Sequence, residues 1–271
     1  MPFDNNLKNM QVPGRVHALC KLLLLENYTY NKLMELLQPV SETGQAHQVY
    51  KLALNGGLIK IDDDKRIHLQ VPEVDVKDSK RFAHYVAKHA FSNTDFIFSK
   101  FSAWVMTRGE KVITETKDEL AERFYIEVSK KYMSSQEYNS TNITGWVTWA
   151  NYFGLGHTFN NKFVVNPSNR IRNEIEYDQE LPRGEYIRFK EFMKWLAKRC
   201  PELDGGEVNL QFNDQFNQQN LSFALSLALR TLHDLKIITL KNTRDVEDIW
   251  YLHEVQTHEI PNQVTDIMVK G

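Results

Sequence analysis

The sequence predicts a mainly α-helical protein with small β-hairpins, an α+β chain. The first observation is the spacing of apolar residues, which recur every three or four positions in several segments, as on the buried face of a helix. The second is a pattern that occurs three times: a helix, a short break, an apolar strand, a polar tip and a second apolar strand. The third is a composition of 42% hydrophobic and 25% charged residues, typical of a folded globular protein.

The first copy of this pattern predicts a unit at residues 1–72. Pro13 suits the first turn of a helix, Ser41 is a good N-cap, and Gly56-Gly57 tolerates the positive φ angles of a helix end. An acidic turn, Asp62–Asp64, separates two strands of alternating apolar residues. The predicted helices span Pro13–Glu26, Tyr30–Leu37 and Ser41–Leu54, and the predicted strands span Leu58–Ile61 and Ile67–Val71.

The second copy closes a predicted central unit at residues 80–170. Its last helix ends at Gly154, and a polar turn at residues 160–162 joins its two strands. Before that pattern come extra helices, so the central unit is a decorated version of the first. The predicted helices span Lys80–Ala90, Asp95–Thr107, Asp118–Met133 and Thr144–Phe153, and the strands span Leu155–Phe159 and Phe163–Val165.

The third copy predicts a C-terminal unit at residues 183–256. Pro72 and alternating charges indicate a linker at Val71–Ser79, and two prolines with a charged stretch indicate a second linker at Asn166–Arg183. A charged turn joins the two strands of this unit. The predicted helices span Ile187–Arg199 and Leu221–His233, and the strands span Lys236–Leu240 and Ile249–Leu252.

The order of three short helices and a hairpin is that of a winged helix-turn-helix. The first strands of the three copies begin at Leu58, Leu155 and Ile237, which are unevenly spaced. Uneven spacing favours divergent duplication over a solenoid. We therefore expect three winged-helix units in series, although a length of 271 residues by itself suggests about two domains.

The sequence offers no motif for catalysis, for a cofactor or for a metal. The nearest approach to a phosphate-binding loop, Gly154–His157, lacks the second glycine spacing and the lysine, so it is interpreted as a tight turn. The histidine pairs His84/His89 and His253/His258 lie five residues apart and have no cysteine pair beside them. We expect no enzyme activity, no cofactor and no metal, with a site assembled from distant residues as the remaining alternative.

The chain has two cysteines, Cys20 and Cys200, and we expect both to be reduced packing residues rather than a disulfide. The N-terminal residues lack the basic and apolar regions of a signal peptide, and the longest apolar run, Leu22–Leu25, is far too short to span a bilayer. We expect a cytoplasmic protein without membrane contact.

The sequence favours nucleic-acid binding over catalysis or metal binding, because the recognition helix of a winged helix enters the major groove. In the first unit this helix carries Gln45, Gln48 and Lys51, and glutamine can bond adenine through both of its amide atoms. In the third unit Gln219 belongs to the amide-rich run Asn217–Asn220 just before the predicted helix, and Arg230 falls late in that helix, where it could reach a phosphate. The alternative is that the amides cap helices and face water, and that Arg230 extends to solvent.

A basic run on the predicted helix Ile187–Arg199 is the strongest local cluster of positive charge. Lys190, Lys194 and Lys198 follow an i,i+4 spacing that aligns three like charges on one face, and Arg188 precedes them. Phosphate would relieve their repulsion, but a solvated helix face has the same pattern.

In the central unit, the aromatic residues of the last helix indicate either core or a protein interface; they are Trp146, Trp149, Tyr152 and Phe153.

Two strings in the third unit, Leu221–Leu225 and Leu232–Ile238, together with the three-copy layout, resemble the winged-helix subunits of bacterial anti-phage systems. In particular the chain resembles the DpdG-like component of the clusters that handle 7-deazaguanine-modified DNA. The layout is also similar to that of the tandem winged-helix partners of chromosome-maintenance ATPases. The resemblance implies work beside ATPase or nuclease partners in antiviral defence, and it transfers no catalytic residue.

These observations favour a non-catalytic winged-helix subunit that binds duplex DNA within a prokaryotic defence or genome-maintenance complex. The net charge of −2 and pI near 6.5 give no global positive field, so we expect weak and non-specific DNA binding. The alternative is a scaffold whose winged helices bind partner proteins, such as an ATPase or a nuclease, rather than DNA. The sequence leaves both open.

Overall fold

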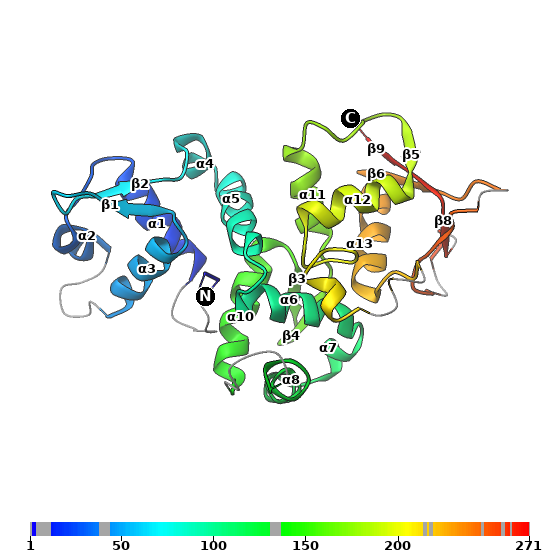
Figure 1. Ribbon diagram of the computed structural model, residues 1–271, viewed down its shortest axis with the longest axis horizontal. Coiled ribbons are helices and arrows are strands. Elements are labelled where there is room, and N and C mark those ends of the chain that lie inside the picture. Colours follow the sequence, from blue (N-terminus) through cyan, green and yellow to red (C-terminus); the bar gives the residue numbers. More distant parts are fainter. Residues whose placement is uncertain are drawn as a thin grey trace. The chain divides into compact units, whose positions relative to one another are not determined.

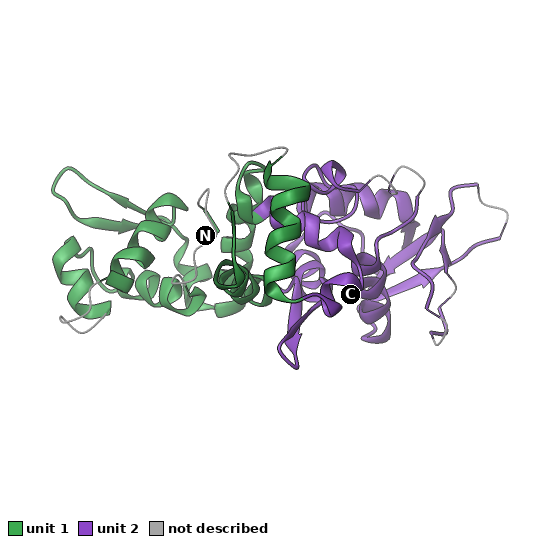
Figure 2. Cartoon of the chain, turned by 90° about the horizontal axis from the view of Figure 1, so that it is seen from below, with its two compact units in different colours: residues 1–98, 116–153 green, residues 99–115, 154–271 purple. Residues whose placement is uncertain are grey.

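The computed structural model describes residues 2–3, 12–37, 44–130, 137–213, 216, 219–244, 247–255, 258–260 and 262–270. The chain divides into two compact units (Figure 2). Unit 1 comprises residues 1–98 and 116–153, and unit 2 comprises residues 99–115 and 154–271. Helices with small antiparallel sheets make up both units, which confirms the predicted α+β class.

The first five elements of unit 1 follow the predicted order of three helices and a hairpin (Figure 1). The helix α1 packs against α2 and α3, and its Val16, Leu19 and Cys20 are fully buried. Gly57 has a φ of +65° where α3 gives way to the hairpin. These elements are α1 (Pro13–Leu23), α2 (Tyr30–Leu37), α3 (Gly44–Asn55), β1 (Ile59–Ile61) and β2 (Ile67–Leu69).

The rest of unit 1 is helical, and it corrects the first predicted linker. Residues 73–77 form a short helix whose Val76 is fully buried, and the Val76 carbonyl lies 2.7 Å from Nε2 of His17. This buried contact ties the segment to α1. The elements are α4 (Glu73–Lys77), α5 (Ser79–Ser92), α8 (Lys117–Phe124), the π-helical turn η1 (Tyr125–Ser129) and α10 (Ser140–Phe153).

Unit 2 begins within α6 and contains the second predicted hairpin. After Gly154, whose φ is +76°, the strands β3 and β4 pair in antiparallel register from Gly156–Val165 to Phe159–Lys162, as predicted. The helical elements are α6 (Ile97–Arg108), α7 (Lys111–Thr114), α11 (Ser168–Tyr177), α12 (Phe189–Arg199), the 3-10 turn η2 (Asn209–Gln211) and α13 (Phe223–Asp234). The hairpin strands are β3 (Gly156–Phe159) and β4 (Lys162–Val165).

The third predicted hairpin is wrong in its pairing. The strand β6 pairs with β9 rather than with the predicted return strand, and β9 is the centre of a three-stranded sheet in the order β5-β9-β6. The predicted return strand instead forms β7 and pairs with β8. The strands are β5 (Tyr186–Arg188), β6 (Ile238–Lys241), β7 (Trp250–Tyr251), β8 (Gln263–Val264) and β9 (Asp266–Val269).

Two further expectations about unit 2 are corrected. The predicted linker at residues 166–183 contains the helix α11, whose Ile171 and Ile175 are buried. The predicted helix from Ile187 begins only at Phe189, because Ile187 and Arg188 pair with β9. The N-cap Ser41 and the part of the predicted helix up to Met133 beyond residue 130 lie outside the described residues.

Burial follows the predicted apolar stripes closely. Leu58, Leu225, Leu229 and Leu232 are fully buried, whereas Leu54 is half-buried. Cys20 and Cys200 are both free and buried, and burial raises the pKa of each thiol, to about 12 for Cys20. Within the described residues, no helix is both long and apolar enough to cross a membrane. The compact units divide the predicted central domain between them, so the three-unit division stays a prediction.

Candidate nucleic-acid interface

The first predicted binding surface is the polar face of α3 in unit 1. Lys51 is exposed, and Gln45 and Gln48 are half-buried beside it. Arg15 of α1 donates from Nη1 to the Oε1 of Gln45, which adds a cation next to the amide. The structure therefore brings the three predicted residues of this helix onto one partly exposed surface.

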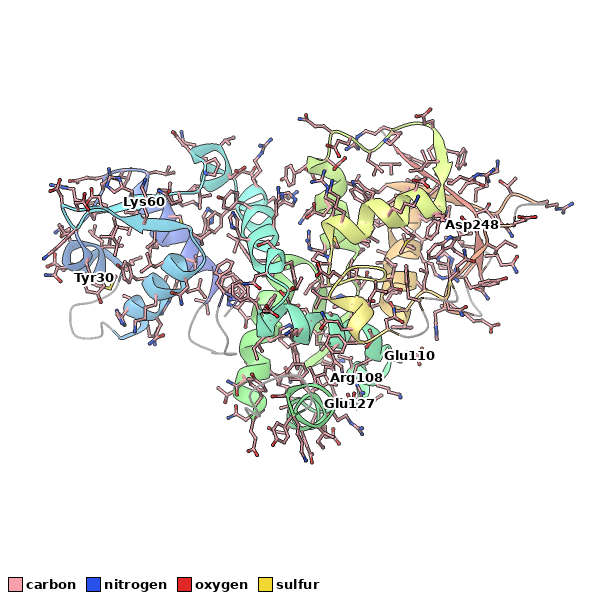
Figure 3. All side chains as sticks on the ribbon, viewed as in Figure 1. Tyr30, Lys60, Arg108, Glu110, Glu127 and Asp248 are labelled. Carbon is pink, nitrogen blue, oxygen red and sulfur yellow. The ribbon has the colours of Figure 1, made fainter. Side chains whose placement is uncertain are left out.

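The neighbouring hairpin carries acid at its tip. Oδ1 of Asp62 accepts from the Arg66 N–H at 2.8 Å, and Oδ2 lies 2.6 Å from Nε2 of His68. These hydrogen bonds, that from His68 first, hold the pKa of Asp62 below its usual range, so its carboxylate stays charged at neutral pH. Lys60 extends from β1 of the same hairpin (Figure 3). A charged carboxylate at the tip disfavours close approach to phosphate.

The second predicted surface is the lysine row of α12 in unit 2. Lys190, Lys194 and Lys198 are all exposed. Nζ of Lys194 lies 2.8 Å from Oε1 of Glu191, whereas Lys190 and Lys198 have no carboxylate within 4.0 Å among the residues that the structure describes. The opposite face of the helix is buried, so the lysine row faces solvent. The buried residues of the helix are Phe189, Phe192, Met193 and Leu196.

Arg188 lies on β5 rather than on the helix, so it does not extend the lysine row along α12. Its Nη1 lies 3.1 Å from Oδ1 of Asp266, and its side chain is 56% exposed. Burial disfavours the charged form of Asp266, but hydrogen bonds from Thr265 and Thr243 outweigh burial and lower the pKa of the carboxyl. Arg188 therefore stands beside a carboxylate whose charged form is favoured.

The predicted binding residues Gln219, which precedes α13, and Arg230, which lies on it, both form hydrogen bonds to other residues of unit 2. Arg230 is 2% exposed and donates to the carbonyl oxygen of Ile260 at 2.9 Å and to Oδ1 of Asn262 at 2.8 Å. Gln219 has a φ of +61° and donates from Nε2 to Oδ1 of Asp248. We leave Arg230 out of the candidate interface, because its guanidinium is buried and bonded to protein oxygens.

The aromatic residues of α10 belong to the core of unit 1, one of the two alternatives that the sequence left open. Trp146, Trp149 and Phe153 are at most 1% exposed. Tyr152 is half-buried, and burial raises the pKa of its hydroxyl well above the usual value. The rings of Trp146, Trp149 and Phe153 are thus unavailable to bases or to a partner protein.

Sequence reasoning missed a pocket of about 580 Å³ in unit 2. The guanidinium of Arg108 lies 4.9 Å from the ring centroid of Trp104 and pairs with Glu115 at 2.5 Å. Oγ of Ser222 accepts from the Leu225 N–H, so the hydroxyl caps α13. The pocket is lined by Thr107, Arg108, Gly109, Glu110, Lys111, Phe212, Asn213, Ser222, Phe223 and His253.

Metal binding finds no support in the described part of the chain, which contains no group of three or more histidine, cysteine, aspartate or glutamate side chains placed to hold an ion. The expectation that the protein holds no metal stays a prediction.

The chain matches a family model when it is compared with known proteins. A family model described as DpdG-like matches residues 6–246, which is most of the chain. No curated protein and no solved structure matches the chain.

Proposed function

The chain belongs to the DpdG-like family. From this premise we propose that it is a component of a multi-subunit DNA modification and defence system, in which it acts as a non-catalytic winged-helix subunit that binds duplex DNA. One observation carries the proposal: the exposed row of Lys190, Lys194 and Lys198 on α12. The winged-helix part of the proposal is supported by the order of α1, α2, α3 and the β1–β2 hairpin in unit 1.

The lysine row suits phosphate because its charges are aligned and because only Lys194 of the three has a carboxylate partner, Glu191, among the described residues. An i,i+4 spacing sets neighbouring side chains about one helical turn apart, so the three ammonium groups repel one another in water. A DNA backbone would replace that repulsion with attraction and release condensed counterions. Three phosphate contacts imply a slope of about −3 when the logarithm of affinity is plotted against that of salt concentration.

A charge-reversal experiment tests the proposal. The triple variant Lys190→Glu, Lys194→Glu, Lys198→Glu should lose binding to a fluorescent duplex at low salt. A control with the same change in net charge, Lys80→Glu, Lys88→Glu, Lys130→Glu, alters exposed lysines elsewhere and should retain most of the affinity. If the two triple variants bind equally well, the α12 row is a solvated face and the proposal is wrong.

A protein-binding role is the second candidate, and one observation favours it. Phe159, at the tip of the β3–β4 hairpin, is 64% exposed. A partner protein that covered this ring would gain the free energy of removing its apolar surface from water. We expect Phe159→Ser to weaken assembly with the other subunits of the system while duplex affinity stays unchanged. If Phe159→Ser co-purifies with the co-expressed subunits as well as the parent does, the protein-binding role is wrong.

The non-catalytic part of the proposal rests on the lack of a recognised motif and on the capping role of Ser222 in the unit 2 pocket. We expect the purified protein to hydrolyse neither ATP nor plasmid DNA with magnesium present. Turnover that co-purifies with the protein and disappears in a single Asp or Glu variant would contradict it.

A further inference from the structure

The three-stranded sheet of unit 2 has two very different faces. Cross-strand partners share a face, and in the row formed by Ile187, Ile267 and Leu240 the central Ile267 and Leu240 are buried while Ile187 is half-buried. Here Ile267 is fully buried, and α12 packs against β5 and β9 while α13 packs against β6. This face is core.

The other face presents an aromatic ring and two cations. One row runs from Tyr186 through Met268 to Thr239, and the next runs from Arg188 through Asp266 to Lys241. Tyr186 is 46% exposed, and both cations are exposed as well. Nζ of Lys241 reaches across the central strand to 5.1 Å from the Tyr186 ring centroid.

Asp266, the carboxylate within these two rows, is compensated from three sides. Besides the ion pair with Arg188, Oδ2 of Asp266 accepts from the hydroxyl groups of Thr243 and Thr265, each at 2.7 Å. Its side chain is only 12% exposed. The charge that remains on the surface is therefore that of Lys241, next to a ring whose polarity suits a planar, electron-poor partner.

We propose that this outer sheet face binds single-stranded DNA, with one base stacked on Tyr186 and the adjoining phosphate bound by Lys241. An exposed aromatic ring on a sheet flanked by cations is the arrangement that accepts an unpaired base, since every base has a π-face and every linkage a negative charge. A duplex hides its base faces and cannot use the ring. The inference concerns a different ligand form from the duplex proposed for α12, and it does not rest on that proposal.

The chemistry of the face favours a nucleic-acid strand over a protein. The apolar groups that it offers are the Tyr186 ring and the half-buried Met268, too few to form the apolar centre of a protein interface. A strand of DNA needs little more than one ring and nearby cations for each nucleotide bound. Charge complementarity therefore selects the polyanion.

The test measures binding of a fluorescent oligothymidylate by anisotropy at low salt. Tyr186→Ala should weaken binding by about 5- to 150-fold, the range for losing one base–aromatic stack. Tyr186→Phe keeps the ring and should bind as the parent does. Tyr251→Ala removes another exposed tyrosine, on β7, and should also leave the affinity unchanged.

Further arms keep the inference falsifiable. Should Tyr186→Ala fail to fold, Lys241→Met leaves the ring in place and should lower both the affinity and the salt slope for the single strand. The triple Glu variant of α12 should retain oligothymidylate binding, so failure of the duplex proposal is distinguishable from failure of this one. Equal binding by parent and Tyr186→Ala, an equal loss in Tyr251→Ala, or tighter binding of oligouridylate RNA would overturn the assignment to single-stranded DNA.

Discussion

Arg170 donates from Nε to Oε1 of Glu202 at 2.9 Å, and both side chains are at most 1% exposed. The same guanidinium donates to the carboxylate of Glu174 one turn along α11 and to the carbonyl oxygen of Arg199 at 3.1 Å. Burial works against the charged form of Arg170, but the charges around it, including both glutamates, keep its pKa above the usual value. The cluster thus joins α11 to the end of α12.

Loss of Arg170 should destabilise unit 2 strongly. Arg170→Leu leaves Glu174 and Glu202 buried without their shared cation, and an uncompensated buried charge costs about 3–5 kcal/mol. Urea unfolding followed by circular dichroism measures the change. The control Arg172→Leu, at an exposed position of the same helix, should change the free energy of unfolding by less than about 0.5 kcal/mol. Equal shifts of the two midpoints would contradict a stabilising role.

Asp204 should make stability depend on pH. Burial raises its pKa to about 6 despite a hydrogen bond from the Ser222 N–H, and its Oδ1 has no hydrogen-bond partner among the described residues. The unfolded carboxyl ionises near pH 4, so the fold favours the protonated form. The stabilising contribution is complete below about pH 4 and is lost as pH rises through about 6.

The variant Asp204→Asn is neutral at every pH and should lack this dependence. From about pH 4 to 7, the free energy of unfolding of Asp204→Asn relative to the parent should therefore rise by about 3 kcal/mol. Urea titrations at several pH values measure the difference, in which the contributions of other groups cancel. A difference that stays constant across this range would show that Asp204 ionises normally.

The local elements of unit 1 were predictable because each is encoded by its own apolar stripe. The bounds of α2 agree at both ends, Tyr30 and Leu37. The helix α11 was missed because Arg170 and Glu174 look like a solvated linker when their burial as a pair is unknown. Ile171 and Ile175, spaced by one helical turn, are the signal that could have identified it.

Strand pairing was less predictable than strand position. The strand β6 has two apolar candidates downstream, and the sequence pattern does not say which of them pairs with it. The nearer, at Trp250, was chosen, whereas β9 at residues 266–269 pairs with it. Long-range contacts also explain why the sequence did not indicate the burial of Arg230, because its oxygen partners lie more than twenty residues away along the chain. The lysine row of α12 was predictable because periodicity alone sets Lys190 and Lys194 opposite the buried Phe192.

Leu229 should be among the costliest single positions of α13. Its side chain is fully buried, and the helix packs against α11 and β6, so Leu229→Ala leaves a cavity and should cost about 2–5 kcal/mol. Leu235→Ala, just after the same helix and 56% exposed, is the matched control. Thermal unfolding compares the two, and a shift for Leu229→Ala no larger than that of the control would refute this packing.

The polar face of α3 should act on DNA through charge rather than through base recognition. Lys51 is exposed and can reach a phosphate, whereas the Oε1 of Gln45 already accepts from Arg15. Lys51→Ala should weaken duplex binding uniformly across sequences and reduce the salt slope by about 1. Gln48→Ala should leave the affinity for every sequence unchanged, and Lys88→Ala, on α5, controls for the lost charge. Anisotropy titrations with several unrelated duplexes over a salt series measure both quantities. If Gln48→Ala weakened binding to one duplex by about 1–3 kcal/mol and spared the others, α3 would read bases directly.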